Sequence, residues 1–300
     1  MPGRADAIVQ RGTALRTLVL AEVARATQEE LTFRPSPDRW SVRETLIHIG
    51  NWEEEGCRYL RCLFAGEPIT PSGPSDINEW NAEAQARYAH LDVEGAVAYI
   101  TRVRQELDAL SLQVTDEQIK QDRQYLGVLL MSPDHEAGHL HQIREALALA
   151  RGDQHEAALA ALRYARQRVL TRLNLEDRPT AALLWQPESG KWSIREHLIH
   201  LGVWDRYWAD AFRSGAVSPL APEQVDQWNR EQVAVRQWMT LADVLHELGA
   251  ARGALEEQMQ LQPAAEIEPA WIERLKKHDD EHMYSILKLL QEWRKANPPT

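Results

Sequence analysis

The chain has 300 residues, 44% of them hydrophobic, which is enough for two domains of ordinary size with a core in each. Asp and Glu outnumber Lys and Arg by 45 to 34, so the chain lacks the basic surface that nucleic acids require. Its first residues scatter charges among apolar side chains, unlike a signal sequence or a membrane span. We therefore expect a cytoplasmic protein with neither nucleic acid nor membrane as a partner.

Helical periodicity runs through the chain from its amino terminus. Apolar residues recur with the 3.6-residue period of an α-helix, and no sustained alternation between turns indicates a strand. The sequence therefore predicts an all-α protein. The expected helices of the first half and the start of the second are, in chain order, 5–31, 42–65, a short piece around Trp80, 92–111, 126–150 and 154–175.

Two capping boxes fix where helices begin. In Ser41-x-x-Glu44 and Ser193-x-x-Glu196, the serine oxygen can accept from an early backbone N–H, and the glutamate can return a bond to the cap residue. Each pair therefore predicts the first residue of the second long helix in its half of the chain.

Proline and glycine mark the connections. Residues 66–75 contain too much Pro and Gly for regular structure and are long for a tight hairpin, so we expect a crossover connection. The last helix of the first half is expected to start before Pro133 and to bend there, because the matching stretch 271–278 contains no helix breaker. Gly152 and Asp153 leave almost no linker, so the two halves should pack as a pseudo-dimer within a monomeric chain.

The two halves repeat one another. Nine of fourteen positions are identical between Trp40–Glu53 and Trp192–Asp205, and a His-x-x-x-His spacing recurs at 135–139 and 278–282. The offset between matching residues drifts along the chain, which indicates loop deletions between fixed anchors. The sequence therefore predicts a tandem of two homologous domains.

The repeated residues include three histidines in each half. Residues four apart lie on one face of a helix, so each His-x-x-x-His can offer two imidazoles to one metal. The third histidine of each half, His48 or His200, sits in an apolar stripe, where a buried imidazole needs a partner for its nitrogens. The sequence therefore predicts two metal sites, formed by His48, His135 and His139 and by His200, His278 and His282.

The remaining histidines lack this repetition. His197 precedes His200 by one turn, but Thr45 occupies its place in the first half, so a supporting or accessory role is restricted to the second half. No metal role is expected for the others, His90, His141, His155 and His246.

These motifs carry a family resemblance. The Trp-Ser-x-Arg-Glu-x-Leu-Ile-His stretch, the pairs Trp80-Asn81 and Trp228-Asn229, and the late His-x-x-x-His resemble the DinB/YfiT-like metalloenzyme superfamily, in tandem over residues 1–151 and 153–296. The resemblance implies two four-helix bundles with up-down-down-up connection. It also implies that each bundle holds a divalent metal through the three histidines predicted above.

Three imidazoles leave coordination positions open, as in a catalytic site. Zinc or nickel suits this ligand set best, and iron and copper are alternatives. The resemblance extends to relatives that are thiol transferases, thiol-dependent isomerases or iron enzymes, so a low-molecular-weight thiol is an expected cosubstrate. Cys57 and Cys62 have no cysteine counterparts in the second half, and no chemistry shared by both halves can depend on them.

Other repeated residues are candidates for the pocket. Glu53 and Asp205 are the weak candidates for a catalytic acid or base, although Glu53 falls in a run of three glutamates that is typical of a solvated face. Trp52 and Trp204 follow the first histidine by one turn and are placed to wall the pocket. Asn81 and Asn229 could bind a substrate or cap a loop.

Two functions fit these features. The first is a metal-dependent transferase or hydrolase that acts on a small molecule. The alternative is a stress-related binding or structural protein whose metal braces the bundle without turnover. The repeated triads favour metal binding in both cases and do not distinguish between them.

Overall fold

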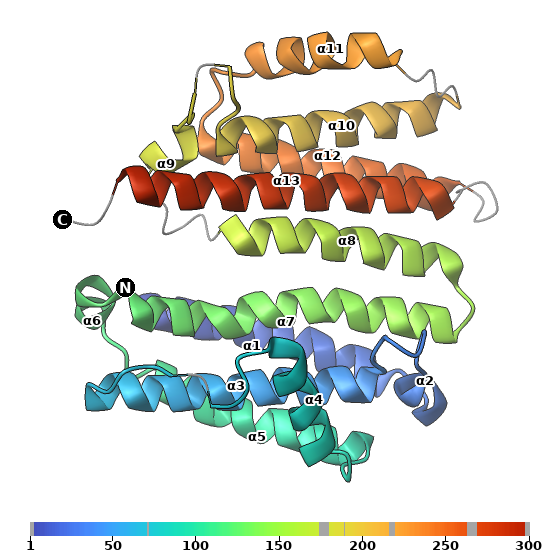
Figure 1. The fold of residues 1–300 in the computed structure, drawn as a ribbon. Coiled ribbons are helices and arrows are strands. Elements are labelled where there is room, and N and C mark those ends of the chain that lie inside the picture. Colours follow the sequence, from blue (N-terminus) through green and yellow to red (C-terminus); the bar gives the residue numbers. More distant parts are fainter. Residues whose placement is uncertain are drawn as a thin grey trace. The chain divides into compact units, whose positions relative to one another are not determined.

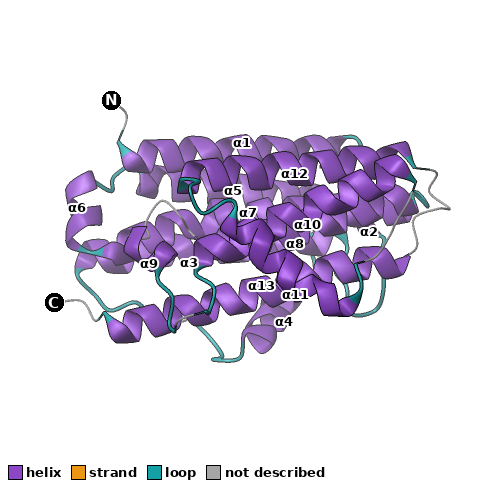
Figure 2. Ribbon diagram, turned by 90° about the horizontal axis from the view of Figure 1, so that it is seen from above, coloured by secondary structure: helices purple, strands orange, loops and turns teal. Residues whose placement is uncertain are grey.

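The computed structural model describes residues 3–70, 72–173, 180–188, 190–215, 220–262 and 269–297. These residues form thirteen helices and no strand (Figures 1 and 2), which confirms the all-α prediction. Contacts divide the chain into two compact units, Met1–Tyr164 and Ala165–Thr300. The boundary falls inside α8 (Gln154–Leu173), the later part of which belongs with the helices that follow it, and each unit is described by itself.

Four long helices build the first unit, and they bury one continuous apolar core. Their bounds are α1 (Arg4–Ala24), α3 (Val42–Ala65), α5 (Val93–Ser111) and α7 (Arg123–Ala150). Short helices lie at the connections, namely α2 (Gln28–Thr32), α4 (Ile77–Arg87) and α6 (Asp116–Gln121).

The second and third long helices run in the same direction. Arg43 near the start of α3 donates to the carbonyl of Leu91 just before α5, and Gly56 further along α3 faces Leu107 near the end of α5. Parallel neighbours require a connection that returns along the bundle. Residues 66–70 and 72–76 without helix, followed by α4, make that return, so the expected crossover is confirmed.

The first and last long helices of this unit are also parallel. Arg11 of α1 pairs with Asp134 of α7, and about three turns later along both helices Glu22 pairs with Arg144. Since α5 and α3 are antiparallel to this pair, the connection is up-down-down-up. The DinB-like topology implied by the motifs is therefore confirmed for this unit.

Capping explains where the sequence-based helix bounds hold and where they fail. Ser41 accepts from the backbone N–H of Glu44, and α3 begins at the next residue as predicted. The single helix expected over 5–31 is wrong, because Thr27 and Glu30 form their own capping box and start α2 after a break. Helix α7 begins before Pro133, as expected. The bend at this proline stays a prediction.

The second unit repeats the arrangement. Arg195 of α10 donates to the carbonyl of Met239 just before α12, and Gly202 faces Leu248, so these helices are parallel. Residues 271–278 are helical throughout, as expected, and residues 174 and 175 of the helix expected at 154–175 lie outside the described part. The helices are α8 (Gln154–Leu173), α9 (Thr180–Leu184), α10 (Ile194–Ser214), α11 (Pro222–Ala234), α12 (Leu241–Leu261) and α13 (Pro269–Ala296).

Candidate metal centres

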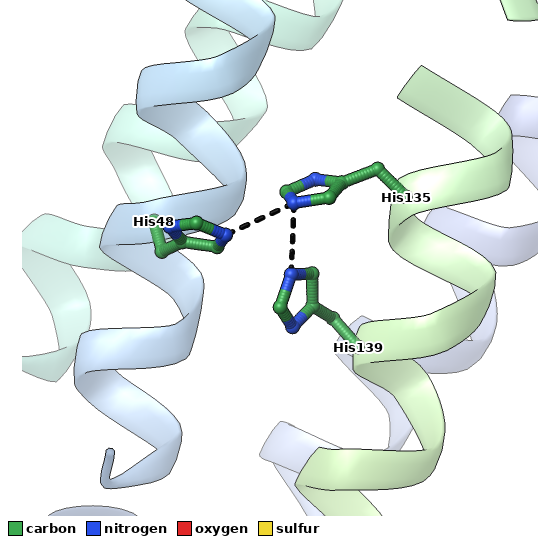
Figure 3. Close-up of side chains that lie close together, drawn as sticks. All are labelled: His48, His135 and His139. Atoms are coloured by element: carbon green, nitrogen blue, oxygen red, sulfur yellow. Dashed lines mark hydrogen bonds between the residues drawn. The ribbon is translucent and has the colours of Figure 1, made fainter. Parts of the chain in front are cut away.

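The three histidines predicted for the first unit converge on one point. His48 lies on α3, and His135 and His139 lie one turn apart on α7 (Figure 3). Nε2 of His135 is 2.9 Å from Nε2 of His48 and 2.9 Å from Nε2 of His139. All three ligand nitrogens fall within 4.8 Å of one another.

This donor set fits a divalent cation. Nitrogens bound at 2.0–2.1 Å to a tetrahedral ion lie about 3.3 Å apart, close to the 2.9 Å that separates Nε2 of His135 from each of the other two Nε2 atoms. Nδ1 of His139 is 2.6 Å from Oε1 of Gln142, an oxygen that can only accept. Nδ1 of His139 therefore carries the proton, and the lone pair of its Nε2 faces His135.

Burial keeps these imidazoles neutral. It lowers the pKa of His139 to about 4 and lowers the pKa of His135 well below its usual value. For His48, burial and the neighbouring His139 lower the pKa, and an interaction with Asn81 opposes them only in part. A metal needs the neutral form of histidine, so the site is ready for a cation without first losing protons at neutral pH.

The second unit has a matching set. Nε2 of His200 on α10 is 3.0 Å from Nε2 of His278 on α13, and His282 completes a group whose ligand atoms lie within 4.8 Å. Burial lowers the pKa of His200 to about 3 and also lowers the pKa of His278 and His282.

The two centres differ in how the last histidine is held. Nδ1 of His197 lies 2.8 Å from Nδ1 of His282. When Nδ1 of His282 donates to His197, the lone pair of His282 that remains for a metal is on its Nε2. Ser285 occupies the place of Gln142 and donates to a backbone carbonyl instead. The structure thus puts His197 against a candidate ligand, and Thr45, its counterpart, donates to the carbonyl of Ser41.

Tryptophans surround each triad. The ring of Trp40 lies 4.5 Å from that of His48, and Trp52 lies 5.8 Å from His135 and 4.6 Å from Trp80, measured between centroids. Trp52 therefore lies beside the triad, the position expected from its place one turn after His48. The sequence reasoning gave Trp40 no place in the site, although its repetition as Trp192 was a signal that it belongs there.

The second triad opens into a cavity of about 500 Å³. Both residues predicted for the pocket of this unit line it, and they are joined by a hydrogen bond of 3.0 Å from Nε1 of Trp204 to Oδ1 of Asn229. The cavity is also lined by the three histidines, by Tyr207, Trp208, Leu220, Val225 and Leu275, and by the charged residues Arg274, Lys277 and Glu281.

A buried group of four charges lies beside the first triad. Arg16 of α1 donates to both carboxylate oxygens of Glu53 at 2.9 and 3.0 Å and also pairs with Glu136. Arg104 of α5 pairs with the same two carboxylates, and Ser132 donates to Glu53 at 2.8 Å. Glu53 is 1% exposed, so its placement on a solvated face is wrong.

The same group recurs in the second unit as Arg166, Asp205, Arg252 and Asp279. Burial alone would raise the pKa of Asp279, but Arg166 and Arg252 hold it below its usual value. Each of the four long helices contributes one charge, which ties the bundle together. In this structure Glu53 and Asp205 hold arginines, and an acid or base role for them stays a prediction.

The sequence reasoning missed six of these eight charged residues. Glu136 directly follows the ligand candidate His135, and Asp279 follows His278 in the same way. Arg16 and Arg104 also have arginine counterparts in the other unit. Comparing the two halves along every helix, rather than only around the histidines, would have found them.

Neither cysteine offers a shared nucleophile. Burial raises the pKa of the Cys57 thiol to about 11, so it stays protonated at neutral pH. Both cysteines are free thiols of α3.

Comparison with known proteins identifies one family. The sequence model of the DinB superfamily matches residues 12–143 and, separately, 161–287. No curated protein and no solved structure matches the chain. Among the described residues, no helix has the length and apolar character needed to cross a membrane.

Proposed function

Since the chain belongs to the DinB superfamily twice over, once in each half, we propose that it is a metal-dependent enzyme with two centres that acts on a small molecule. One observation carries the proposal. In each unit, three buried or half-buried histidines bring their ligand nitrogens within 4.8 Å of one another. The ligands would be the two sets named above, with zinc or nickel as the preferred metal and iron as the alternative.

The protein's own groups fit a site with an open position. Three imidazoles leave room for a substrate atom, and a divalent cation held there would supply Lewis acidity to that atom. Gln142 and His197 hold the ring of the last histidine in each set. The tryptophans lie against the histidine rings, and the cavity of about 500 Å³ in the second unit has the size of a small-molecule site.

A low-molecular-weight thiol fits this site as the nucleophile. Cys57 is buried and protonated, and its counterpart in the second unit is Ala209, so the chain has no repeated thiol of its own. A thiolate is a good ligand for zinc and is activated by coordination. We therefore infer a thiol-dependent transferase, with hydrolysis by an activated water as the other reaction of this class.

One observation favours the alternative of a metal that only braces the bundle. Each triad links two helices, α3 with α7 or α10 with α13, beside a charge group that already joins all four. A metal bound by the triad would add one more link between helices that these ion pairs already join. The cavity beside the second triad supports the enzyme over the brace, because a brace does not need a cavity.

The test begins with metal analysis of protein purified without a His-tag or nickel column. We expect close to two divalent metals per chain, and about one in His139→Ala, since each set belongs to a separate bundle. Conjugation of small thiols to an electrophile is then measured with metal-loaded and metal-free protein. Protein that holds no metal would refute the proposal, and bound metal that raises the melting temperature without any turnover would establish the bracing role.

A further inference from the structure

Arg274 shares a helix face with two of the candidate ligands. It precedes His278 by one turn of α13, and His282 follows by another turn. All three residues line the cavity of about 500 Å³ in the second unit. A guanidinium is therefore placed at the same cavity as the three imidazoles.

This guanidinium has no carboxylate partner among the residues that the structure describes. It lies over the ring of Trp271, 5.6 Å from the centroid, and so is held in place by an uncharged group. The other cation of the cavity wall, Lys277, pairs with Glu281 at 3.6 Å. Arg274 is therefore the cation of this wall whose hydrogen-bond donors remain for a ligand.

The first unit has no such cation at this place. Met131 is the counterpart of Arg274, and its methyl group fills the space beside Gly56. In the second unit Trp208 stands in place of that glycine and packs against Trp271, with ring centroids 4.2 Å apart. Position 274 carries a charged, exposed residue, whereas Met131 is only half-buried.

We propose that the cavity of the second unit binds a small molecule with a carboxylate, which Arg274 holds while another atom of the molecule reaches the metal. This inference rests on the proposed function, because it assumes a metal at His200, His278 and His282. A planar guanidinium binds a carboxylate through two parallel hydrogen bonds. Four residues, about 6 Å along the helix axis, separate Arg274 from the first ligand, so a small molecule can reach both.

The experiment compares two thiols that differ in their charge. Each site is studied alone, the second in His139→Ala and the first in His282→Ala, with cobalt(II) as a visible substitute for the native metal. 3-Mercaptopropionate and 2-mercaptoethanol are titrated, and thiolate binding is followed by the absorption of cobalt. We expect the second site to bind the carboxylate-bearing thiol about tenfold more tightly, as one charged hydrogen-bonded pair provides, and the first site to show no preference.

Substitution assigns the preference to one residue. Arg274→Gln should remove it and leave the binding of 2-mercaptoethanol unchanged, and Met131→Gln is the matched control in the first unit. Because residue 274 is exposed, the variant should keep its helix content, which circular dichroism checks. Equal binding of both thiols at the second site would overturn the inference and leave the metal function intact. Cobalt that fails to bind at either site would overturn the proposed function itself, and this inference with it.

Discussion

Replacing His197 by alanine tests how the second centre is supported. The change removes the group that faces Nδ1 of His282 at 2.8 Å and leaves all three candidate ligands in place. The partner of a metal-bound histidine fixes which nitrogen carries the proton and how the ring is turned. Without it, His282 can present the wrong nitrogen or rotate away from the metal.

The size of the effect follows from the kind of bond. Loss of such a partner typically lowers metal affinity about 10–100-fold, which is roughly 1.4–2.7 kcal/mol. The bond here joins two neutral imidazoles, since burial lowers the pKa of His197 to about 4. Neutral pairs are weaker than charged ones, so we expect a loss of about tenfold.

Competition with a zinc chelator measures the affinity, with His139→Ala as the background so that only the second site binds. His197→Gln should recover most of the lost zinc affinity, because in the first unit Oε1 of Gln142 accepts from Nδ1 of His139 at 2.6 Å. The matched control is Thr45→Ala in the His282→Ala background, which should not change zinc affinity at the first site. A full loss in His197→Gln, or no loss in His197→Ala, would show that this contact does not position the ligand.

Three further predictions concern the folded chain as a whole. Glu136→Gln should lower the free energy of unfolding by about 3–5 kcal/mol, because it removes one of the two buried carboxylates that balance the charges of Arg16 and Arg104. The exposed Glu117→Gln should change it by less than about 0.5 kcal/mol in the same denaturant titration. Small-angle scattering should give one compact particle of monomeric mass, as expected for a pseudo-dimer joined at Gly152, and two freely moving lobes would count against it. Zinc affinity should stay constant from pH 7.5 to about 5.5 and fall near pH 4, because burial lowers the pKa of His139 to about 4. A histidine with its unperturbed pKa of about 6.5 would instead lose zinc near pH 6.5. The stability of metal-free protein should fall over the same range. Unfolded chains take up protons below about pH 6.5 while the folded site does not, so the free energy of unfolding falls toward pH 4, by about 3 kcal/mol at most for His139. Thermal melts between pH 7.5 and pH 4 would show this loss.

Local sequence signals predicted the helices because their causes are local. Ser41 and Ser193 begin helices through bonds to residues three positions away, and both starts were predicted to the residue. The break after Ala24 was missed although its cause is of the same kind, a capping box between Thr27 and Glu30. A continuous apolar period across residues 5–31 outweighed that signal, which shows that a cap can interrupt a helix without any Pro or Gly.

The triads were predictable for a different reason, which is repetition. His48 and His135 are 87 positions apart, and no local rule joins them, but both recur in the second half. The charge group has the same property, yet Arg16 and Glu136 each look like an ordinary charge on an amphipathic helix. Only burial reveals their role, since Glu136 is 0% exposed. Burial of a charge depends on all four helices and cannot be read from any one of them.

The differences between the halves bear on function as much as the similarities do. The ligand candidates are the same in both, but the partner of the last histidine is Gln142 in one unit and His197 in the other. The position of Arg274, which lines the cavity of the second unit, is also exchanged, because its counterpart in the first unit is Met131 beside Gly56. Both exchanges leave the three imidazoles in position, so the candidate ligands are the same in each unit while their surroundings differ. Under the proposed function, two sites with the same ligands and different walls would hold one kind of metal and receive two different small molecules.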